Sequence, residues 1–324
     1  MSALKYRRGS YVTRSPAAAL RACIVACAVF AMAPAAWAGP NNCSVTAATH
    51  SFGAFDTLNA NPGTSSITLT CSTNGKAFTF DYRIALSAGS GSFANRQMSG
   101  GGDVLNFNHY TSAAYASVWG DGSAGTVTVT GSLFVPKSGG NTATTILTVF
   151  GLIGGPQNVV PAAYATTAPI TVTVSAITAG DFPTVTTTFN TNASVAAQCN
   201  ATAATLGFGS VNPLSSQVDA TTSITVNCTK TSAYTVGLDP GTSAGSTIAQ
   251  RIMANGADSM LYNLYTNSAR TSVWGNSAGS WLSGTGGGLT IPQAWTVYGR
   301  IAPGQTNLAA GSYQENAITV TVTY

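Results

Sequence analysis

The sequence predicts an all-β protein with two tandem β-sandwich domains, and three observations lead to this prediction. Only 7% of the 324 residues are charged and a single glutamate, Glu315, is present, whereas surface helices rely on Glu, Lys, Arg, Gln and Leu. Short runs rich in Thr, Val and Ser alternate between apolar and polar residues, and turn residues, including many of the 35 glycines, separate them. A set of motifs also occurs twice at nearly equal spacing, so the chain divides into two domains of ordinary size.

Residues 1–38 have the three parts of a secretory signal peptide: a basic section, an apolar section at 22–33, and a small-residue cleavage pattern at 36–38. The apolar section is shorter than the roughly 20 residues that a membrane-spanning helix needs, which favours removal over a retained anchor. Five of the 13 Lys and Arg residues and none of the nine acidic residues lie in the signal, so the mature chain has eight basic against nine acidic residues. Nothing therefore indicates a partner that is a nucleic acid.

Four cysteines remain in the mature chain, an even number in an exported protein, and this predicts disulfides. Cys43 and Cys71 are 28 positions apart, and Cys199 and Cys228 are 29 apart. Because each pair falls inside one copy of the repeat, we expect Cys43 to pair with Cys71 and Cys199 with Cys228. In the chain-entropy model a loop of this length contributes roughly 3 to 4 kcal/mol of stability.

Further motifs follow the first cysteine of each copy in the same order. They are Phe-Gly at 52–53 and 208–209, Arg-x-Met at 96–98 and 251–253, Val-Trp-Gly at 118–120 and 273–275, and Thr-Val-aromatic-Gly at 148–151 and 296–299. The repeat places the first domain at 39–176 and the second at 198–324, with a linker or strand segment at 177–197. Because both tryptophans occupy the same frame, we interpret Trp119 and Trp274 as core residues rather than ligand-stacking residues.

Each copy ends in a strand that alternates with period two. Residues 316–324 predict a strand with four residues on one face, Ile318, Val320, Val322 and Tyr324, and residues 168–176 repeat the pattern. The segment at 177–197 also alternates, between Val185 and Val195. Its start is able to complete the first domain while its end begins the second, and a plain linker with a first strand is the alternative.

Both copies resemble the spore coat protein U domain, whose family includes pilin subunits and two-domain tip subunits of archaic chaperone-usher pili. The resemblance rests on the cysteine spacing with Phe-Gly, on Thr-Val-Tyr-Gly-Arg-Ile at 296–301, and on Gly-Ser-Tyr at 311–313 before the final strand. It implies immunoglobulin-like domains, with the last strand of the second one missing. A chaperone strand and then the strand of a neighbouring pilin subunit would occupy the resulting groove beside the residues at 318–324.

The predicted mature amino terminus is too short to act as a donor strand. Only Gly39, Pro40, Asn41 and Asn42 precede Cys43, and Pro40 lacks the N–H that a central strand needs. A subunit that accepts a strand but gives none is expected at the end of a fibre.

An enzyme is not expected, and neither is a cofactor or a metal site. The chain has two histidines, His50 and His109, and neither has a metal or nucleophile partner at motif spacing; we interpret His109 as an exposed strand residue. Asp103 near Asn106 and Asn108 does not match a calcium loop. A carbohydrate-acting enzyme is disfavoured by the scarcity of carboxylates.

Residues that differ between the copies are candidates for an adhesive surface. Tyr115 corresponds to Arg270, and the run at 152–164 is more apolar than its counterpart; its members of interest are Leu152, Ile153, Val159, Val160 and Tyr164. If the strand at 170–174 leads directly towards the second domain and successive strands are antiparallel, the loops at 72–76, 112–125 and 152–167 meet at the far end.

These inferences lead to one functional hypothesis. We interpret the protein as the tip adhesin of an archaic chaperone-usher pilus, exported through the periplasm to the cell surface and involved in attachment and biofilm formation. Its expected partners are a periplasmic chaperone, an outer-membrane usher, a neighbouring pilin subunit, and a host or abiotic surface. The alternative is a structural coat or matrix protein of the spore coat U type without a tip role.

Overall fold

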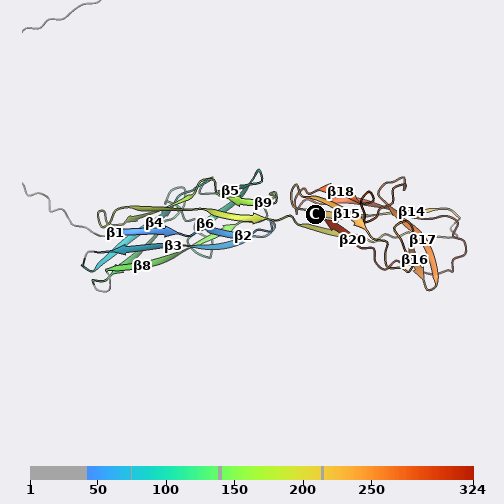
Figure 1. Cartoon of the computed structure of the whole chain (residues 1–324), viewed down its shortest axis with the longest axis horizontal. Coiled ribbons are helices and arrows are strands. Elements are labelled where there is room, and N and C mark those ends of the chain that lie inside the picture. Colours follow the sequence, from blue (N-terminus) through green and yellow to red (C-terminus); the bar gives the residue numbers. More distant parts are fainter. Residues whose placement is uncertain (1–41, 74, 138–140, 213–214) are drawn as a thin grey trace, which may run out of the picture. The chain divides into compact units, whose positions relative to one another are not determined.

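The computed structural model describes residues 42–73, 75–137, 141–212 and 215–324. The predicted signal peptide and the next three residues lie outside this part of the chain. All regular structure in the described residues is β, as predicted (Figure 1). Strands β1–β12 form the two sheets of the first domain, and strands β13–β20 form the two sheets of the second.

The first domain has an eight-stranded sheet with the order β1-β3-β8-β6-β5-β9-β12-β2 and a four-stranded sheet with the order β11-β10-β4-β7. The strand bounds are β1 Asn42–Ala47, β2 His50–Ala54, β3 Asn61–Ser72, β4 Phe78–Leu86, β5 Arg96–Gly100, β6 Asp103–Tyr110, β7 Val129–Val135, β8 Thr142–Ile153, β9 Ala162–Ala165, β10 Ile170–Ala176, β11 Val185–Phe189 and β12 Thr191–Val195.

The second domain has a five-stranded sheet with the order β13-β14-β19-β17-β16 and a three-stranded sheet with the order β18-β15-β20. The strand bounds are β13 Cys199–Ala203, β14 Val218–Cys228, β15 Ala233–Leu238, β16 Arg251–Asn255, β17 Asp258–Tyr265, β18 Leu282–Thr285, β19 Gln293–Ile301 and β20 Val320–Thr323.

Both predicted disulfides form, and each joins directly opposed residues of two neighbouring strands. Cys43 of β1 lies opposite Cys71 of β3, and Cys199 of β13 lies opposite Cys228 of β14. Each bond therefore fixes the register of an edge strand against its neighbour.

The apolar faces of the strands form one core in each domain. Trp119 and Trp274 are buried in these cores, which confirms the prediction for both. Each indole Nε1 donates a hydrogen bond to a backbone carbonyl, that of Ile84 or that of Val236, so that the polar atom is satisfied inside the core.

A buried arginine fixes the tryptophan loop in both domains. Arg96 Nη2 donates to the carbonyl oxygens of Ser87 and Trp119, and Nη1 donates to Asn108 Oδ1. Arg251 repeats this arrangement with Asp239, Trp274 and Asn263. Burial lowers the pKa of Arg96 to about 10 and also lowers that of Arg251. The repeated Arg-x-Met motif thus marks a structural brace.

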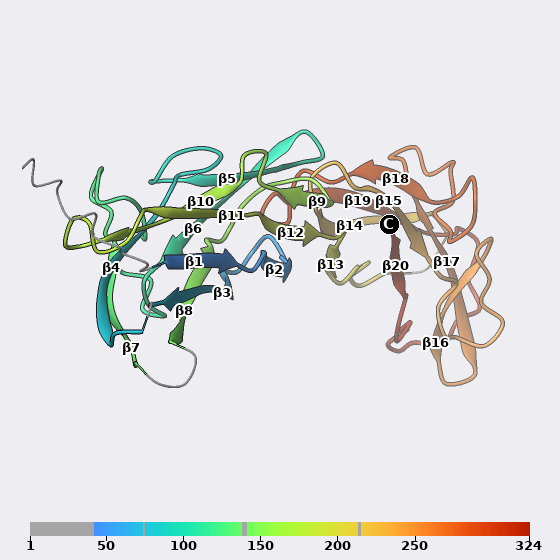
Figure 2. The same cartoon turned by 60° about the vertical axis from the view of Figure 1, so that its left-hand side comes forward.

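The segment between the repeats pairs with the first domain over its whole ordered length. β11 pairs antiparallel with β10, and Figure 2 shows the two strands beside each other. β12 lies between β9 and β2, antiparallel to the former and parallel to the latter. The second domain's first strand begins at Cys199, directly after Gln198, whose N–H donates a hydrogen bond to Thr229 Oγ1.

Candidate functional site

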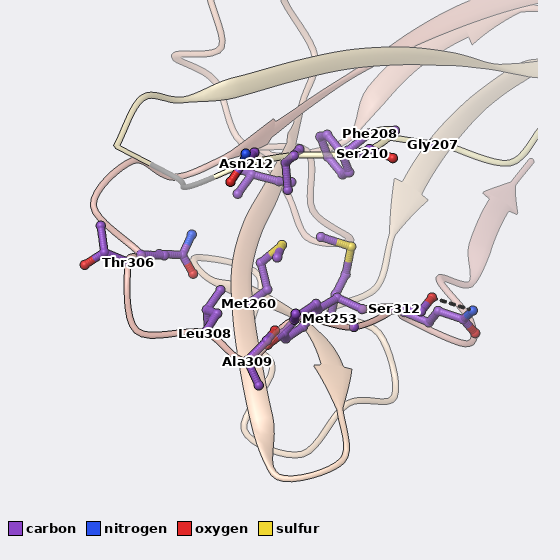
Figure 3. A pocket seen from close by; sticks show the side chains of 18 of the residues that line it. Gly207, Phe208, Ser210, Asn212, Met253, Met260, Thr306, Leu308, Ala309 and Ser312 are labelled. Atoms are coloured by element: carbon purple, nitrogen blue, oxygen red, sulfur yellow. Dashed lines mark hydrogen bonds between the residues drawn. The ribbon is translucent and has the colours of Figure 1, made fainter.

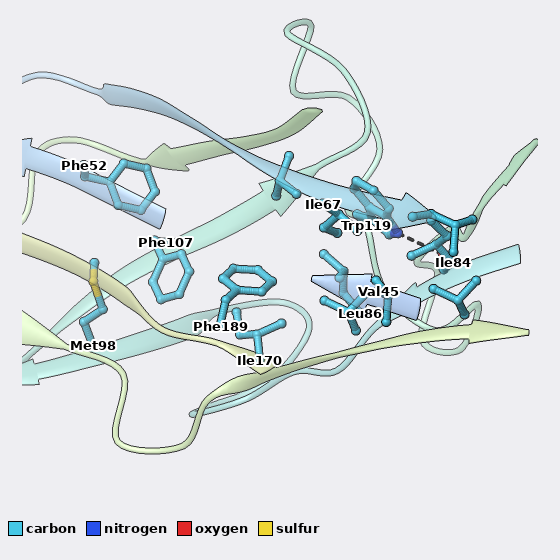
Figure 4. Packing of buried hydrophobic residues seen from close by; sticks show 14 of the residues in the cluster. Val45, Phe52, Ile67, Ile84, Leu86, Met98, Phe107, Trp119, Ile170 and Phe189 are labelled. Carbon is cyan, nitrogen blue, oxygen red and sulfur yellow. Dashed lines mark hydrogen bonds between the residues drawn. The ribbon is translucent and has the colours of Figure 1, made fainter. Parts of the chain in front are cut away.

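Strands β11 and β12 close the first domain by filling the space between its sheets. Phe189 lies opposite Ile170 in the β10–β11 pair, and its side chain is buried with those of Ala193 and Val195 of β12 (Figure 4). The segment therefore contributes both backbone hydrogen bonds and apolar side chains, alternating along the strand as a buried edge requires.

The second domain has no strand in the corresponding place. By the spacing of the repeat, Ile318 corresponds to Ile170, and the segment at 206–210 corresponds to β2. β10 has neighbours on both sides, whereas β20 pairs with β15 alone in the described chain. Residues 206–210 likewise belong to no strand. In the first domain β10 pairs with β11 and β2 pairs with β12, whereas the counterparts of β10 and β2 in the described second domain lack these partners.

A groove of two adjoining cavities takes the place of the missing strands. The first has a volume of about 790 Å³ and lies between the segment at 206–212 and the residues at 305–314 (Figure 3). The second, of about 740 Å³, runs on between the segment at 203–208 and the residues at 313–320. The two share Leu206, Phe208 and Met253 in their walls. We call the two together the open groove.

The open groove has an apolar floor. Met253, Met260, Tyr262 and Leu264 line it, the first two of which Figure 3 shows facing the segment that carries Phe208. Unfilled apolar walls of this length lose the packing contacts that the corresponding walls have in the first domain. Burial raises the pKa of the Tyr262 phenol well above its usual value, so this hydroxyl remains neutral.

Two of the residues predicted to form the free edge, Ile318 and Val320, line the open groove, and Val322 and Tyr324 follow them in the chain; we call these four residues the rim. Ile318, Val320 and Val322 are half-buried, and Tyr324 is 59% exposed. The regular strand spans only four residues rather than the nine predicted, because a β-partner is present on one side alone.

Glu315 anchors the start of this rim. Its carboxylate accepts hydrogen bonds from the backbone N–H and hydroxyl of Thr242, from the N–H of Ser243 and from the N–H of Ala317. Burial alone would raise the pKa of Glu315, but these hydrogen bonds, first those from Thr242 and Ser243, lower it to about 2. The rim is therefore held in place by the domain itself.

The comparisons with known proteins agree with this architecture. The model of the Spore Coat Protein U domain matches residues 28–173 and again residues 185–323. The chain belongs to the spore coat protein U domain family. It is 34% identical to Protein U of Myxococcus xanthus over an alignment of 157 residues, and the match covers 44% of this chain and 86% of that protein. The family assignment supports a structural protein rather than an enzyme.

A solved structure has a similar fold. It is a chain from the complex of CsuC with CsuE, the tip adhesion subunit of archaic chaperone-usher Csu pili of Acinetobacter baumannii. The TM-score is 0.53 at 16% identity, over 87% of this chain and all of that one. At this identity the likeness concerns the fold.

The apolar run expected on the surface of the first spore coat U domain is largely internal. Ile153, Val159 and Tyr164 are buried, and Leu152 and Val160 are half-buried. The Tyr164 hydroxyl donates to the carbonyl of Val160, which folds the run back on itself. These side chains therefore do not form the exposed apolar loop that was expected.

The three expected adhesive loops also do not meet. In the β3–β8 pair Ser72 lies opposite Thr142, whereas Ile153 lies opposite Asn61 at the other end of the strand, about 35 Å away at 3.3 Å per residue. The separation follows from the β3–β8 register itself, whereas the return of the chain into β11 changes only the end of the domain from which the chain leaves. Tyr115, in the loop at 112–125, is half-buried and packs edge-on against Tyr110.

His109 is fully buried, so its interpretation as an exposed strand residue is wrong. Its ring lies 4.8 Å from that of His50, measured between centroids, inside the first core. The described residues contain no group of three or more His, Cys, Asp or Glu side chains placed to hold a metal ion. Within the same residues no helix has the length and apolar character required to cross a membrane.

Sequence reasoning did not identify two sets of functional residues. The closing side chains Phe189, Ala193 and Val195 were part of an alternating run, but alternation does not name a strand's partner. The second set is the groove floor, which includes Met253 of the Arg-x-Met motif and Met260 of β17. Because the Arg-x-Met motif occurs in both domains, it does not indicate which domain has a filled site and which an unfilled one.

Proposed function

We propose that this protein is a subunit of a surface fibre of the archaic chaperone-usher type and that its open groove binds extended strands from other proteins. In this proposal a periplasmic chaperone occupies the groove first, and a strand of the neighbouring pilin subunit replaces it at the outer-membrane usher. An extended strand would hydrogen-bond to β20 and place alternate side chains in the groove.

One observation carries the proposal: the first domain contains, in β11 and β12, the strand that the second domain lacks. The filled site buries Phe189 opposite Ile170, and the unfilled site leaves Ile318 beside a groove. Since both domains have the same strand order around this site, the filled one is a direct template for the occupied state of the other. An unpaired edge of this kind also requires protection from aggregation before assembly, which a chaperone supplies.

The proposal is tested at the inward face of β20. Val320→Asp with Val322→Asp places charges on the rim and should abolish co-purification with a co-expressed periplasmic chaperone of the archaic chaperone-usher type. The control is Thr321→Asp with Thr323→Asp, on the exposed face of the same strand, which should leave the complex intact. Unchanged co-purification of the Val320 and Val322 double variant would contradict the proposal.

We further propose a place at the fibre tip and a role in attachment and biofilm formation. The first domain is closed by its own strand, so each chain offers a single groove and accepts a single neighbour. The opposite end of the first domain, where β10 turns back into β11, would then face outward. Two exposed apolar side chains flank this end: Ile177 at 50% exposure and Phe134 at 60%.

This attachment surface replaces the one expected from the sequence. Phe134 lies opposite Thr79, and the Ile177 N–H donates to Asp81, so both residues flank the first half of β4. Phe134→Ser with Ile177→Ser should reduce attachment of assembled fibres to an apolar surface, because less apolar area is buried on contact. Ile146→Ser, which removes an equally exposed side chain from the middle of β8, is the control. Wild-type attachment by the first variant would exclude this surface.

The second candidate function is that of a coat or matrix protein, and the match to the Spore Coat Protein U domain favours it. Here the groove would accept a strand from another copy or from another coat protein. Adjacent chaperone and usher genes support the fibre, and their absence supports the coat.

A further inference from the structure

The first core contains two imidazoles at a place where the second core contains two leucines. His50 and His109 correspond to Leu206 and Leu264 by their spacing from the first cysteine and from the Arg-x-Met motif. Both histidines are fully buried. Leu264 is buried and Leu206 is half-buried at the open groove, so the second domain has apolar side chains at both positions.

The histidine pair lies directly under the closing strand. The backbone N–H of His50 donates to the carbonyl of Asn190 at 2.9 Å, and His50 lies opposite Thr191 in the parallel β2–β12 pair. The ring of His109 lies 5.4 Å from that of Phe189, between centroids. Any charge on these rings is thus placed against the residues that close the domain.

The surroundings stabilise neutral rings. His50 Nδ1 is 3.1 Å from Ser65 Oγ, but His50 Nε2 and both ring nitrogens of His109 have no hydrogen-bond partner in the described structure. Phe52 and Phe107 pack against the pair, and a Cβ on Gly63 would lie 2.8 Å from His50 Nε2, which leaves no room for a compensating side chain. A protonated ring here would have donors without acceptors.

No carboxylate acts on the pair. The other histidine and Arg96 of β5 are the charged or titratable groups that influence His109, and both are cationic when charged. The elements that pack around the rings present the Ser65 hydroxyl from β3, Gly151 from β8, the Phe189 ring from β11 and Thr191 from β12, none of which ionises near neutral pH.

We propose that the histidine pair makes closure of the first domain dependent on pH, so that mild acid releases β11 and β12 and opens a groove like that of the second domain. Release exposes both rings to water, where they take up protons. The closed state excludes those protons, so acid favours the open state. The inference stands on the first domain alone and does not depend on a role in a fibre.

The direction of the pH effect follows from the pKa values of the two histidines in the closed and open domain. Burial lowers the pKa of His50 from 6.5 to about 4 in the closed domain, and burial, followed by the charges of His50 and Arg96, lowers that of His109 well below 6.5. Closure is thus fully favoured above about pH 6.5 and weakens progressively as the pH falls from there towards about 4. His50 alone should shift the opening equilibrium about 30-fold between pH 7.5 and pH 5, and His109 adds to this shift.

Hydrogen-exchange mass spectrometry of the full chain at pH 7.5 and pH 5, corrected for intrinsic exchange rates, tests the proposal. Protection of peptides that cover β11 and β12 should fall by about 30-fold or more. The matched variant His50→Leu with His109→Leu copies the second domain and should show no such fall. Peptides of β19 in the second domain should not change in either protein.

Unchanged protection in the wild type, or an equal fall in the leucine variant, would overturn the proposal. If the leucine variant does not fold, NMR titration of the wild-type imidazoles decides. Rings that titrate near pH 6.5 while β11 and β12 remain protected would overturn it, whereas rings that remain neutral until these strands lose protection would support it.

Discussion

The two domains share the order of five strands in one sheet and of three in the other, their disulfide and their arginine brace, and they differ most in the closing strands, which the described second domain lacks. In the first domain the chain turns after β10 and returns as β11 and β12, which bury Phe189 against the core. In the second domain the same position is the open groove. The comparison shows that this fold tolerates a missing strand because its other fixed points, the disulfide and the brace, lie outside the closing strand.

The largest effect is expected from making the first domain resemble the second. Phe189→Ala should lower the unfolding free energy of the first domain by about 3 to 5 kcal/mol, because it leaves a large cavity under the closing strand. Urea denaturation followed by hydrogen exchange separates the two domains. Thr188→Ala, on the exposed face of β11, should change stability little. Equal effects of the two variants would contradict closure by β11.

The converse change should make the second domain resemble the first. The sequence of residues 185–195, fused after Tyr324 through a flexible linker, should fill the open groove and raise the stability of the second domain by about 3 kcal/mol, because it buries apolar area in cis. A fusion in which Asp replaces the residue equivalent to Phe189 is the control and should give no gain. Equal stabilisation by both fusions would show that the groove does not accept this strand.

Loss of the arginine brace should lower the unfolding free energy of the two domains by similar amounts. Arg96→Met and Arg251→Met each leave several buried carbonyl oxygens without donors, and each should cost its domain about 2 to 3 kcal/mol. Domain-resolved hydrogen exchange measures both losses. A much larger loss in the second domain would mean that the brace compensates for the missing strand, which would sharpen the contrast between the domains.

The smallest effect is expected at Glu315. Glu315→Gln weakens the hydrogen bonds to Thr242 and Ser243 and should cost about 1 kcal/mol at pH 7. The folded pKa is lowered to about 2 from 4.5, so the stabilisation is present above about pH 4.5 and is lost as the pH falls towards 2. The difference between wild type and variant in urea denaturation should therefore shrink between pH 5 and pH 3. A difference that stays constant would exclude this role of the carboxylate.

The features that could be predicted are those carried by local pattern or by repetition. The sandwich class, both disulfides and the burial of Trp119 and Trp274 follow from alternation, cysteine parity and shared frames, and the structure confirms them. The rim residues Ile318, Val320 and Val322 were also recognised from alternation, which marks the side of a strand that faces a core or a groove.

The features that could not be predicted depend on long-range pairing. The pattern at 185–195 shows a strand but not its partner, and alternation does not give the β3–β8 register that places the loops at 72–76 and 152–167 at opposite ends. The burial of His109 was missed for a different reason. Its neighbours in sequence suggest an exposed strand, and only the approach of β2 and β11 encloses it.

The closing strand of the first domain is covalently attached to the site that it fills. A short tether keeps such a segment at an effective local concentration of the order of millimolar, so a free strand of equal intrinsic affinity competes only at similar concentrations. Dilution therefore does not open the first domain, whereas under the proposed function the occupancy of the open groove depends on the concentration of the partner strand. Closure of the first domain is thus independent of the concentration of free strands, whereas the proposed filling of the open groove depends on it.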